Sequence, residues 1–162
     1  MAIAELGMGN FSSGWKRYEW RWKKPSPPTA RHLSLPRWNG ERVEGAIVAW
    51  GEQGLGDEMI YASMIPDLAQ RAGSVILQVE PRLVKLFARS FPQVQVIGHG
   101  EPLPQSAVVQ SPLASLGAYL RPSWDAFPRR EAGYLVADRD QAANLRRRLS
   151  PKGEAVVGLS WV

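Results

Sequence analysis

The stretch GAIVAWGEQGLGDEMI, residues 45–60, decides the fold class of this protein. Residues 46–50 form a short apolar run that suits a strand buried on both faces of a sheet. Residues 51–56 contain three glycines, and an apolar periodicity typical of a helix begins at residue 57. A buried strand, a glycine-rich turn and a helix in this order predict the first βαβ unit of a parallel sheet.

The alternation of strand and helix continues along the chain. We expect further strands at residues 75–79, 94–97, 107–110 and 155–159, and helices at residues 57–72, 81–91, 114–120 and 138–149. Pro66 is expected to kink the first of these helices. The pattern predicts an α/β fold, with a Rossmann-like, mostly parallel sheet flanked by helices and joined by right-handed crossovers.

A short helical pair is expected before the sheet, in residues 1–24. Gly7 and Gly9 end the first helix, and Ser12 or Ser13 is expected to cap the second. The second helix carries three aromatic residues on one face, Trp15, Tyr18 and Trp22. Such a stripe predicts packing against the rest of the protein.

The domain boundaries follow from composition. Residues 25–44 are rich in proline, which excludes a continuous helix and predicts an ordered linker anchored by Trp38. Residues 45–153 are expected to form the Rossmann-like domain. The apolar segment at residues 154–162 is expected to begin a second domain.

Composition excludes several classes of protein. The chain has 162 residues, 44% of them hydrophobic, which is enough for one domain with a proper core. Cysteine is absent, so disulfides and thiolate metal sites are excluded. No apolar run is long enough for a membrane span and no signal-peptide pattern opens the chain, so we expect a cytoplasmic protein.

The net charge of +5 has two interpretations: a surface that meets nucleic acid, anionic lipid or phosphorylated substrates, or a part of a larger protein whose balancing half is not counted. The basic residues nearest the N-terminus are Lys16, Arg17, Arg21, Lys23 and Lys24. Nucleic acid is disfavoured as their partner, because Glu19 interrupts the run and the interleaved tryptophans exceed what phosphate contact needs.

The glycine loop at residues 51–56 carries the chemical signal. Its spacing, G-x-x-G-x-G, differs from that of dinucleotide-binding loops, and the G-K-[ST] ending of phosphate-cradling loops is absent. The carboxylates of Glu52, Asp57 and Glu58 would repel a pyrophosphate at the helix N-terminus. This charge pattern favours a hydroxyl-bearing ligand.

Asp57 is the candidate catalytic residue. A carboxylate at a helix start beside a glycine loop can accept a proton from a hydroxyl. The alternative is an N-cap that only stabilises the helix, and one residue can do both. Glu52 is the next candidate for the base.

Glu80 and His99 are weaker candidates, and the role expected of them is substrate binding in the cleft. Each follows a predicted strand, so each is expected at the carboxyl edge of the sheet. Glu80 is also positioned to cap the helix that begins at Pro81. His32 and His99 have no second ligand at metal-binding spacing, so no metal site is predicted.

Three ordered motifs give a resemblance to a known family. They are GWKRYEWRW at residues 14–22, WNG at residues 38–40 and GEQGLGD at residues 51–57. Together they resemble bacterial proteins that join tetratricopeptide repeats to a GT-B glycosyltransferase. Those enzymes are similar to the ADP-heptose:lipopolysaccharide heptosyltransferases and, more distantly, to O-GlcNAc transferase.

The resemblance implies an acceptor-side half of a glycosyltransferase. It places Asp57 as the general base and implies substrate contacts from the loop residues Glu52, Gln53, Gly54, Leu55 and Gly56. The nucleotide-sugar donor is implied to bind mainly to a second domain outside this chain, without a metal or other cofactor. Glu52 and Gln53 depart from the heptosyltransferase pattern, so the resemblance does not fix the acceptor, and a hydroxyl of a glycan, a lipopolysaccharide or a protein stays open. This chain alone is expected to be inactive.

A second hypothesis keeps the same fold without catalysis. The aromatic and basic helix together with the cleft would then bind a protein or a glycan. Loss of product formation on substitution of Asp57 in a longer polypeptide discriminates between the two hypotheses.

Overall fold

The sheet has four strands. The computed structural model describes residues 1–32, 34–129 and 131–160. The strand order is β3-β2-β1-β4, and all neighbouring pairs are parallel. The bounds are Val43–Trp50 for β1, Ala72–Val79 for β2, Gln95–Gly98 for β3 and Ala107–Pro112 for β4. The predicted α/β, Rossmann-like fold is confirmed, and in the described residues its sheet is entirely parallel.

The strand order creates a switch point between β1 and β4. The chain moves outward from β1 through β2 to β3 and then returns to place β4 on the other side of β1. Trp50 lies beside Gln78 of β2 and Pro112 of β4, so the three strands reach the same level. In open α/β sheets, ligands bind in the crevice outside the carboxyl ends of strands at such a point.

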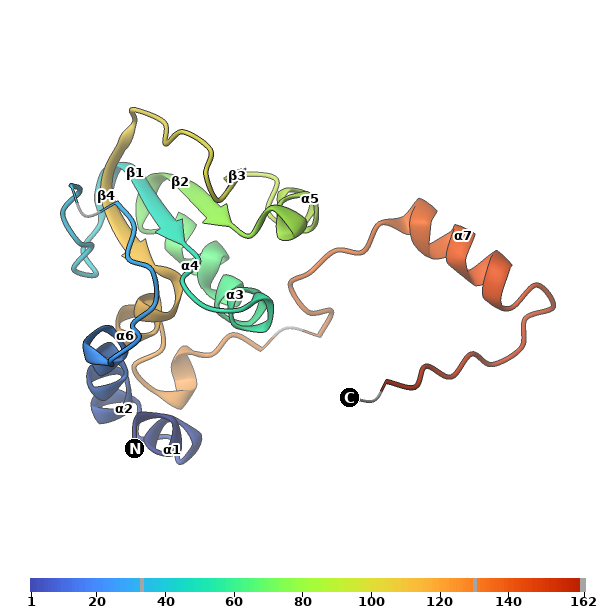
Figure 1. The fold of residues 1–162 in the computed structure, drawn as a ribbon, viewed down its shortest axis with the longest axis horizontal. Coiled ribbons are helices and arrows are strands. Elements are labelled where there is room, and N and C mark those ends of the chain that lie inside the picture. The colour runs from blue at the N-terminus through green and yellow to red at the C-terminus, as the bar shows by residue number, and fades with distance from the viewer. Residues whose placement is uncertain (33, 130, 161–162) are drawn as a thin grey trace.

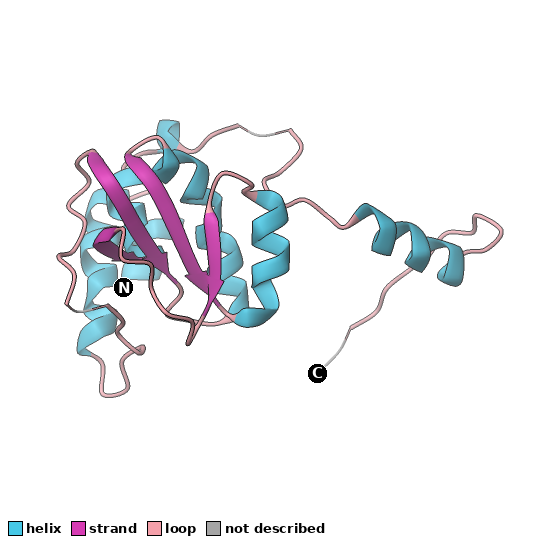
Figure 2. Ribbon diagram, turned by 90° about the horizontal axis from the view of Figure 1, so that it is seen from above, coloured by secondary structure: helices cyan, strands magenta, loops and turns pink. Residues whose placement is uncertain are grey.

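Helices and short 3-10 turns lie mostly behind the strands in Figure 2. The elements between strands are α3 (Leu55–Tyr61), η2 (Ala62–Met64), α4 (Ile65–Ala69) and α5 (Pro81–Ser90). Those after β4 are η3 (Leu113–Leu116), α6 (Gly117–Leu120), η4 (Trp124–Ala126) and α7 (Arg139–Leu149). The single helix predicted at residues 57–72 is divided into three pieces. Pro66 lies in the first turn of α4, where its missing N–H is tolerated.

The core divides between the two faces of the sheet. The larger cluster includes Ile47, Leu77 and Phe87, all fully buried, and joins the sheet to the helices. The smaller cluster on the other face consists of Ala46, Val48, Ile76, Ile97 and Ala107, with Leu35 and Leu103 packed against it.

The N-terminal segment contains the predicted helical pair, α1 (Ala2–Gly7) and α2 (Phe11–Tyr18), followed by the 3-10 turn η1 (Glu19–Lys23). The predicted cap at Ser12 or Ser13 is wrong. Helix α2 begins at Phe11 because Gly9 turns the chain with φ of 82° just before the N-cap Asn10. The Ser13 hydroxyl donates to the Asn10 carbonyl instead, at 3.3 Å.

Helix α2 and the segment after η1 pack on the α/β domain. The indole N–H of Trp15 donates to the Arg121 carbonyl at 2.8 Å. Residues 36–38 run beside β4, since Gln110 donates its N–H to Pro36 and accepts from Trp38, both at 2.9 Å. Trp38 is buried in the larger core cluster. The N-terminal residues therefore form part of the same packed body as the sheet.

Helix α7 stands apart from the sheet in Figure 1 and buries no residue. The strand predicted at residues 155–159 is wrong for the described chain, where these residues form neither a strand nor a helix. No described strand lies alongside them, and Val157 is 80% exposed. Trp161 and Val162, which end the predicted second-domain segment, lie outside the described residues. Within residues 1–32, 34–129 and 131–160, no helix has the length and apolar character to cross a membrane.

Candidate active site

The glycine loop lies at the carboxyl end of β1. Strand β1 ends at Trp50, residues 51–54 form the loop, and α3 begins at Leu55 with Gly54 as its N-cap. The turn after β4 approaches the same edge through Ser115 in η3. The loop and this turn therefore flank the switch point between β1 and β4.

Gly51 is required by packing. A Cβ added at Gly51 would lie 2.1 Å from Oε1 of the buried Glu58 side chain. Gly56 has open space around the position of a Cβ, and neither Gly54 nor Gly56 has a positive φ. These two exposed glycines leave the backbone at the start of α3 uncovered.

Asp57 is the third residue of α3 and is half-buried. Its Oδ2 accepts the N–H of Gly54 at 3.3 Å. The alternative prediction of an N-cap is therefore corrected: Gly54 occupies that position, and Asp57 reaches back to it from the first turn. Oδ1 of Asp57 accepts no hydrogen bond from any residue that the structure describes.

Glu58 joins the ends of three strands. Its side chain is 3% exposed, and Oε1 lies 3.1 Å from Nε2 of His99, which follows β3. Oε2 accepts the N–H of Glu80, which follows β2, at 2.9 Å. Gly51, which follows β1, packs against the same carboxylate. Glu58 was not among the predicted site residues, although its place after a glycine loop is a signal that could have selected it.

Glu80 and His99 lie at the predicted edge of the sheet. The Glu80 side chain makes no capping hydrogen bond, and its Oε1 pairs with Nε of Arg82 at 2.9 Å. His99 is 17% exposed through its side chain, and its buried Nδ1 has no partner among the described residues. Glu58 is the residue that brings these two predicted positions together.

Glu52 is enclosed. Its side chain is 1% exposed, and Oε1 lies 3.0 Å from Nη2 of Arg21. Burial raises the pKa of Glu52, while the charge and hydrogen bond of Arg21 act in the opposite direction. Because Arg21 covers this carboxylate, Glu52 is not placed to meet a substrate hydroxyl.

Arg21 also contacts two other polar side chains. Its Nη1 donates to Oε1 of Glu19 at 2.8 Å, and its Nη2 donates to Oγ of Ser115 at 2.6 Å. Arg37 donates to Oε2 of Glu19 at 2.7 Å. Burial alone would raise the pKa of Glu19, but the hydrogen bond from Ser115 and the two arginines together lower it.

Gln53 connects the loop to α2. Its Nε2 donates to the Tyr18 hydroxyl at 3.0 Å, and the Tyr61 hydroxyl donates to the same oxygen at 3.1 Å. Burial, the bond to Tyr18 and the nearby carboxylates of Asp57 and Glu52 raise the pKa of Tyr61 well above its ordinary value. Tyr61 therefore remains a hydrogen-bond donor.

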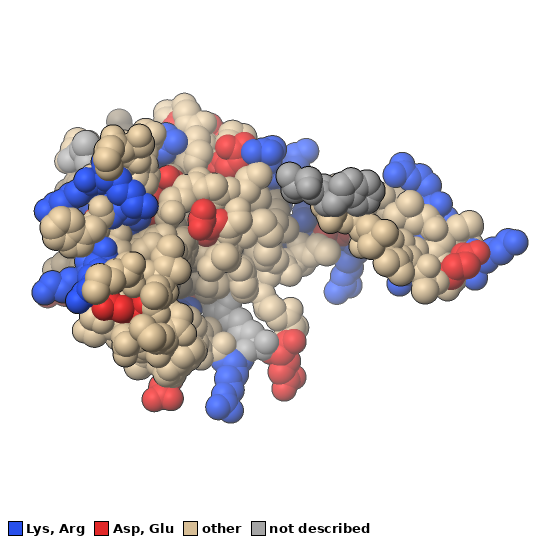
Figure 3. All heavy atoms as spheres, turned by 60° about the horizontal axis from the view of Figure 1, so that its bottom comes forward, with Lys and Arg blue, Asp and Glu red and all other residues tan. Residues whose placement is uncertain are grey.

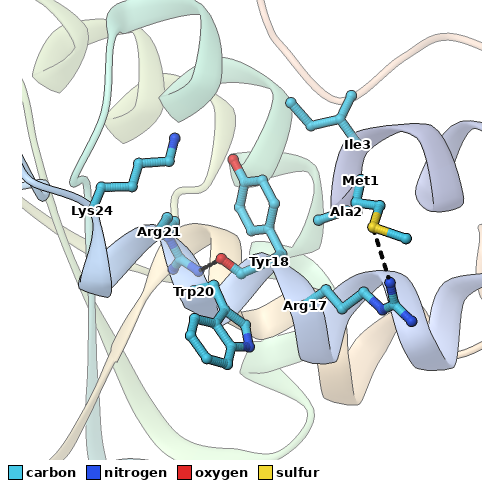
Figure 4. A pocket seen from close by; sticks show the side chains of 8 residues that line it. All are labelled: Met1, Ala2, Ile3, Arg17, Tyr18, Trp20, Arg21 and Lys24. Atoms are coloured by element: carbon cyan, nitrogen blue, oxygen red, sulfur yellow. Dashed lines mark hydrogen bonds between the residues drawn. The ribbon is translucent and has the colours of Figure 1, made fainter.

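A hollow of about 560 Å³ opens beside this network, between α1 and the α2–η1 segment (Figure 4). Its lining residues are Met1, Ala2, Ile3, Arg17, Tyr18, Trp20, Arg21 and Lys24. Tyr18 and Arg21 belong both to the hollow and to the contacts that hold the glycine loop. Trp20 is 62% exposed, so an aromatic surface is open to a ligand there.

The predicted site residues thus divide into three groups. Gln53, Gly54, Gly56 and Asp57 lie together at the rim of the loop, whereas the half-buried Leu55 packs against the core. Glu80 and His99 converge on Glu58, and Glu52 is enclosed by Arg21. In the part of the chain that is described, no three His, Asp or Glu side chains gather into a metal-binding group.

Basic side chains gather at two ends of the molecule (Figure 3). One group lies at the end opposite α7, and the other lies on α7 itself, which carries Arg146, Arg147 and Arg148 in its last turn. Within the N-terminal basic run, Arg21 is buried, and Arg17 lies 3.3 Å from Glu5. The run therefore does not form one continuous exposed basic surface.

The sequence is similar to that of a known protein. The chain is 33% identical to Protein FlbA of Caulobacter vibrioides, over an alignment of 177 residues. The match covers 96% of this chain and 29% of FlbA, so the chain spans less than a third of that relative's length. No protein-family model matches the sequence. No solved structure matches it.

Proposed function

We propose that this chain is the acceptor-side α/β domain of an inverting GT-B glycosyltransferase. The enzyme transfers a sugar from a nucleotide-sugar donor to a hydroxyl of a glycan, a lipopolysaccharide or a protein. Asp57 is the general base in this proposal, and no cofactor or metal takes part.

The position of Asp57 carries the proposal. One carboxylate oxygen is engaged by the N–H of Gly54. The other accepts no hydrogen bond from the described residues, and Asp57 forms no salt bridge with a described Lys, Arg or His. Because the neighbouring Gly54 and Gly56 are exposed and have no side chains, a hydroxyl can approach the free oxygen along the bare loop.

The chemical step follows from this arrangement. Asp57 accepts the proton of the acceptor hydroxyl while that oxygen bonds to the anomeric carbon of the donor. The bond from the anomeric carbon to the diphosphate breaks, and its electron pair leaves with the phosphate oxygen. Attack from the face opposite the leaving group inverts the anomeric centre. Helix N-termini and basic side chains of the donor-binding domain stabilise the departing diphosphate.

Two observations support a larger enzyme around this chain. Most of FlbA lies outside the match with this chain. Residues 155–160 expose an apolar run, in which Val157 and Leu159 are each 80% exposed. We assign the donor to a second α/β domain that begins near residue 154. We also propose a cytoplasmic location, with which the absence of cysteine from the chain agrees.

Transfer assays test the proposal. The full polypeptide that carries this chain is incubated with ADP- and UDP-sugars and with candidate acceptors, and products are identified by mass spectrometry. We expect transfer by the full polypeptide and none by residues 1–162 alone. The isolated chain is expected to bind these sugars more weakly than micromolar, a level that corresponds to about −8 kcal/mol. Micromolar binding or turnover by the isolated chain would show that the donor site lies within it.

The hollow beside η1 favours a second candidate, a binding module without turnover. Its exposed Trp20 ring and the apolar side chains of Met1 and Ile3 fit a glycan or a polypeptide segment. Binding of an acceptor without any product from the full polypeptide would favour this candidate. The buried Arg21 and the paired Arg17 count against a nucleic-acid partner.

A further inference from the structure

The crevice at the switch point is filled by a side chain of the protein itself. Glu52 follows β1 and Ser115 follows β4, and the Arg21 guanidinium contacts both, at 3.0 Å and 2.6 Å from the same Nη2. The outward space between the ends of these strands is the usual ligand position in open α/β sheets. Here an arginine from the N-terminal segment links the loops that leave the two strands.

Arg21 is held through its two terminal nitrogens and by two aromatic rings, whereas its buried Nε has no hydrogen-bond partner among the described residues. Its side chain is 4% exposed. The guanidinium carbon lies 4.8 Å from the centre of the Tyr18 ring and 4.7 Å from that of the Trp22 ring. Nη1 contacts Glu19 at 2.8 Å and the Tyr18 carbonyl at 3.2 Å. The planar group therefore has one orientation, which a lysine ammonium could not reproduce.

Stability alone does not account for this arrangement. A buried ion pair gains little over apolar residues of similar volume, because both charges must leave water. The contacts of Arg21 do, however, fix where Glu52 lies, and Glu52 is the second residue of the glycine loop. The guanidinium of Arg37 and the carboxylate of Glu19 complete the local charge balance.

We propose that Arg21 is a positioning residue for the glycine loop. By linking Glu52 to Ser115, it sets the path of residues 51–54 and thereby the place of Asp57 at the start of α3. This inference rests on the proposed function for the part that concerns Asp57. Displacing a catalytic group by about 1 Å can lower a rate by about 10²-fold.

The test separates positioning from charge neutralisation. Arg21→Met alone leaves the buried Glu52 carboxylate without its cationic partner, although its hydrogen bonds with Gln53 and the Ala114 backbone remain. The variant that decides is therefore Arg21→Met with Glu52→Gln. This double variant removes both charges and retains both side-chain volumes. The matched control is Arg42→Met with Glu44→Gln, which makes the same exchanges at exposed positions near the start of β1.

Hydrogen exchange of the 162-residue chain gives the first result. The amides of Gly51 and Glu58 are hydrogen-bonded to Gln78 and Gly54, at 2.9 and 3.0 Å. In the double variant we expect exchange of residues 51–58 to accelerate about tenfold or more, as for loss of a hydrogen bond to a charged group. Residues 75–79 and the control variant should exchange at the wild-type rate. Wild-type exchange at residues 51–58 in the double variant overturns the proposal.

Kinetics of the full polypeptide give the second result. We expect kcat of the double variant to fall about 10²-fold, with KM for the acceptor changed far less. Recovery of wild-type kcat would mean that Arg21 only neutralises Glu52, which overturns its role in placing Asp57. Absence of transfer by the wild-type polypeptide would instead refute the proposed function, and the exchange result would still decide whether Arg21 holds the loop.

Discussion

Helices α3 and α7 both begin with carboxylates in the first turn, but only α3 packs into the core of the molecule. The start of α7 is linked to α5 through Arg89, which lies 3.8 Å from the carboxylate of the N-cap Asp138. Asp138 caps α7 by accepting the N–H of Gln141 at 3.0 Å, and this bond lowers the pKa of Asp138. Asp57 accepts the N–H of Gly54 in a similar way. Yet α7 buries no residue, whereas Glu58 in the first turn of α3 is 2% exposed and joins three strand ends.

The difference between α3 and α7 distinguishes a carboxylate that only stabilises a helix from one that the surrounding structure holds in position for catalysis. A carboxylate in the first turn stabilises a helix wherever it occurs. It becomes a candidate catalytic group only where the surrounding structure fixes its position and leaves one oxygen free. At α3 this is achieved by Glu58 on one side of the loop and by Arg21 with Glu52 on the other.

Removal of the Glu58 carboxylate should have the largest effect on stability. Glu58→Ala removes the acceptor of the partly buried N–H of Glu80 and the partner of Nε2 of the His99 ring. We expect a loss of about 3 kcal/mol, the upper end of the cost of an unsatisfied buried donor. Urea denaturation of the chain measures it. Glu131→Ala, at an exposed position, is the control and should be neutral. A loss in Glu58→Ala no larger than in the control would mean that the three strand ends do not depend on Glu58.

Gly51→Ala tests the contact between Gly51, which follows β1, and the Glu58 carboxylate. The added methyl group overlaps Oε1 of Glu58, so we expect destabilisation of about 1–3 kcal/mol. Gly56→Ala has open space and a helical position, and should be neutral or slightly stabilising. Combining Gly51→Ala with Glu58→Ala should cost less than the sum of the two, because the methyl group enters the vacated space. Strict additivity would argue against direct contact.

Asp138→Ala should have the smallest effect on the whole molecule. Loss of this cap is expected to reduce helix content within residues 139–149 only, because α7 buries no residue and the ion pair of Asp138 with Arg89, at 3.8 Å, is partly exposed and contributes little. Hydrogen exchange should show faster exchange in this segment, with an unchanged unfolding midpoint for the sheet. A lowered midpoint for the whole domain would show that α7 packs on it in solution, and would remove the contrast with α3.

Local signals made α7 and the sheet predictable. The cap at Asp138, the apolar runs of β1 and β2 and the proline that opens α5 all act on neighbouring residues, and these four predicted elements are present. The strand predicted at residues 155–159 is absent, because strand formation also depends on a partner that is distant in the sequence. Its apolar pattern is suitable, but a strand also requires a partner for its backbone hydrogen bonds, and no described strand lies beside it.

The sequence predicts where the candidate site lies in the fold. It does not predict which side chains contact one another there. The glycine loop, Glu80 and His99 lie at the carboxyl edge because parallel strands bring their ends together. That Glu52 faces inward could not be read from the loop, since its partner Arg21 lies 31 residues earlier in the chain. Glu58 was not predicted as a site residue. Its partners Glu80 and His99 follow two other strands and are distant from it in the sequence.

The kcat of Asp57→Asn in the full polypeptide tests the central claim most directly. Asparagine can still accept the N–H of Gly54, so the shape of α3 is preserved while the proton acceptor is removed. The matched control is Asp140→Asn, which makes the same exchange in the first turn of α7. If Asp57 is the general base, kcat falls by about 10²–10⁴-fold in Asp57→Asn, with little loss of stability and no change in the control. Retention of more than roughly a third of the wild-type kcat, far from that range, would contradict the account and leave Asp57 as a structural residue of the first turn.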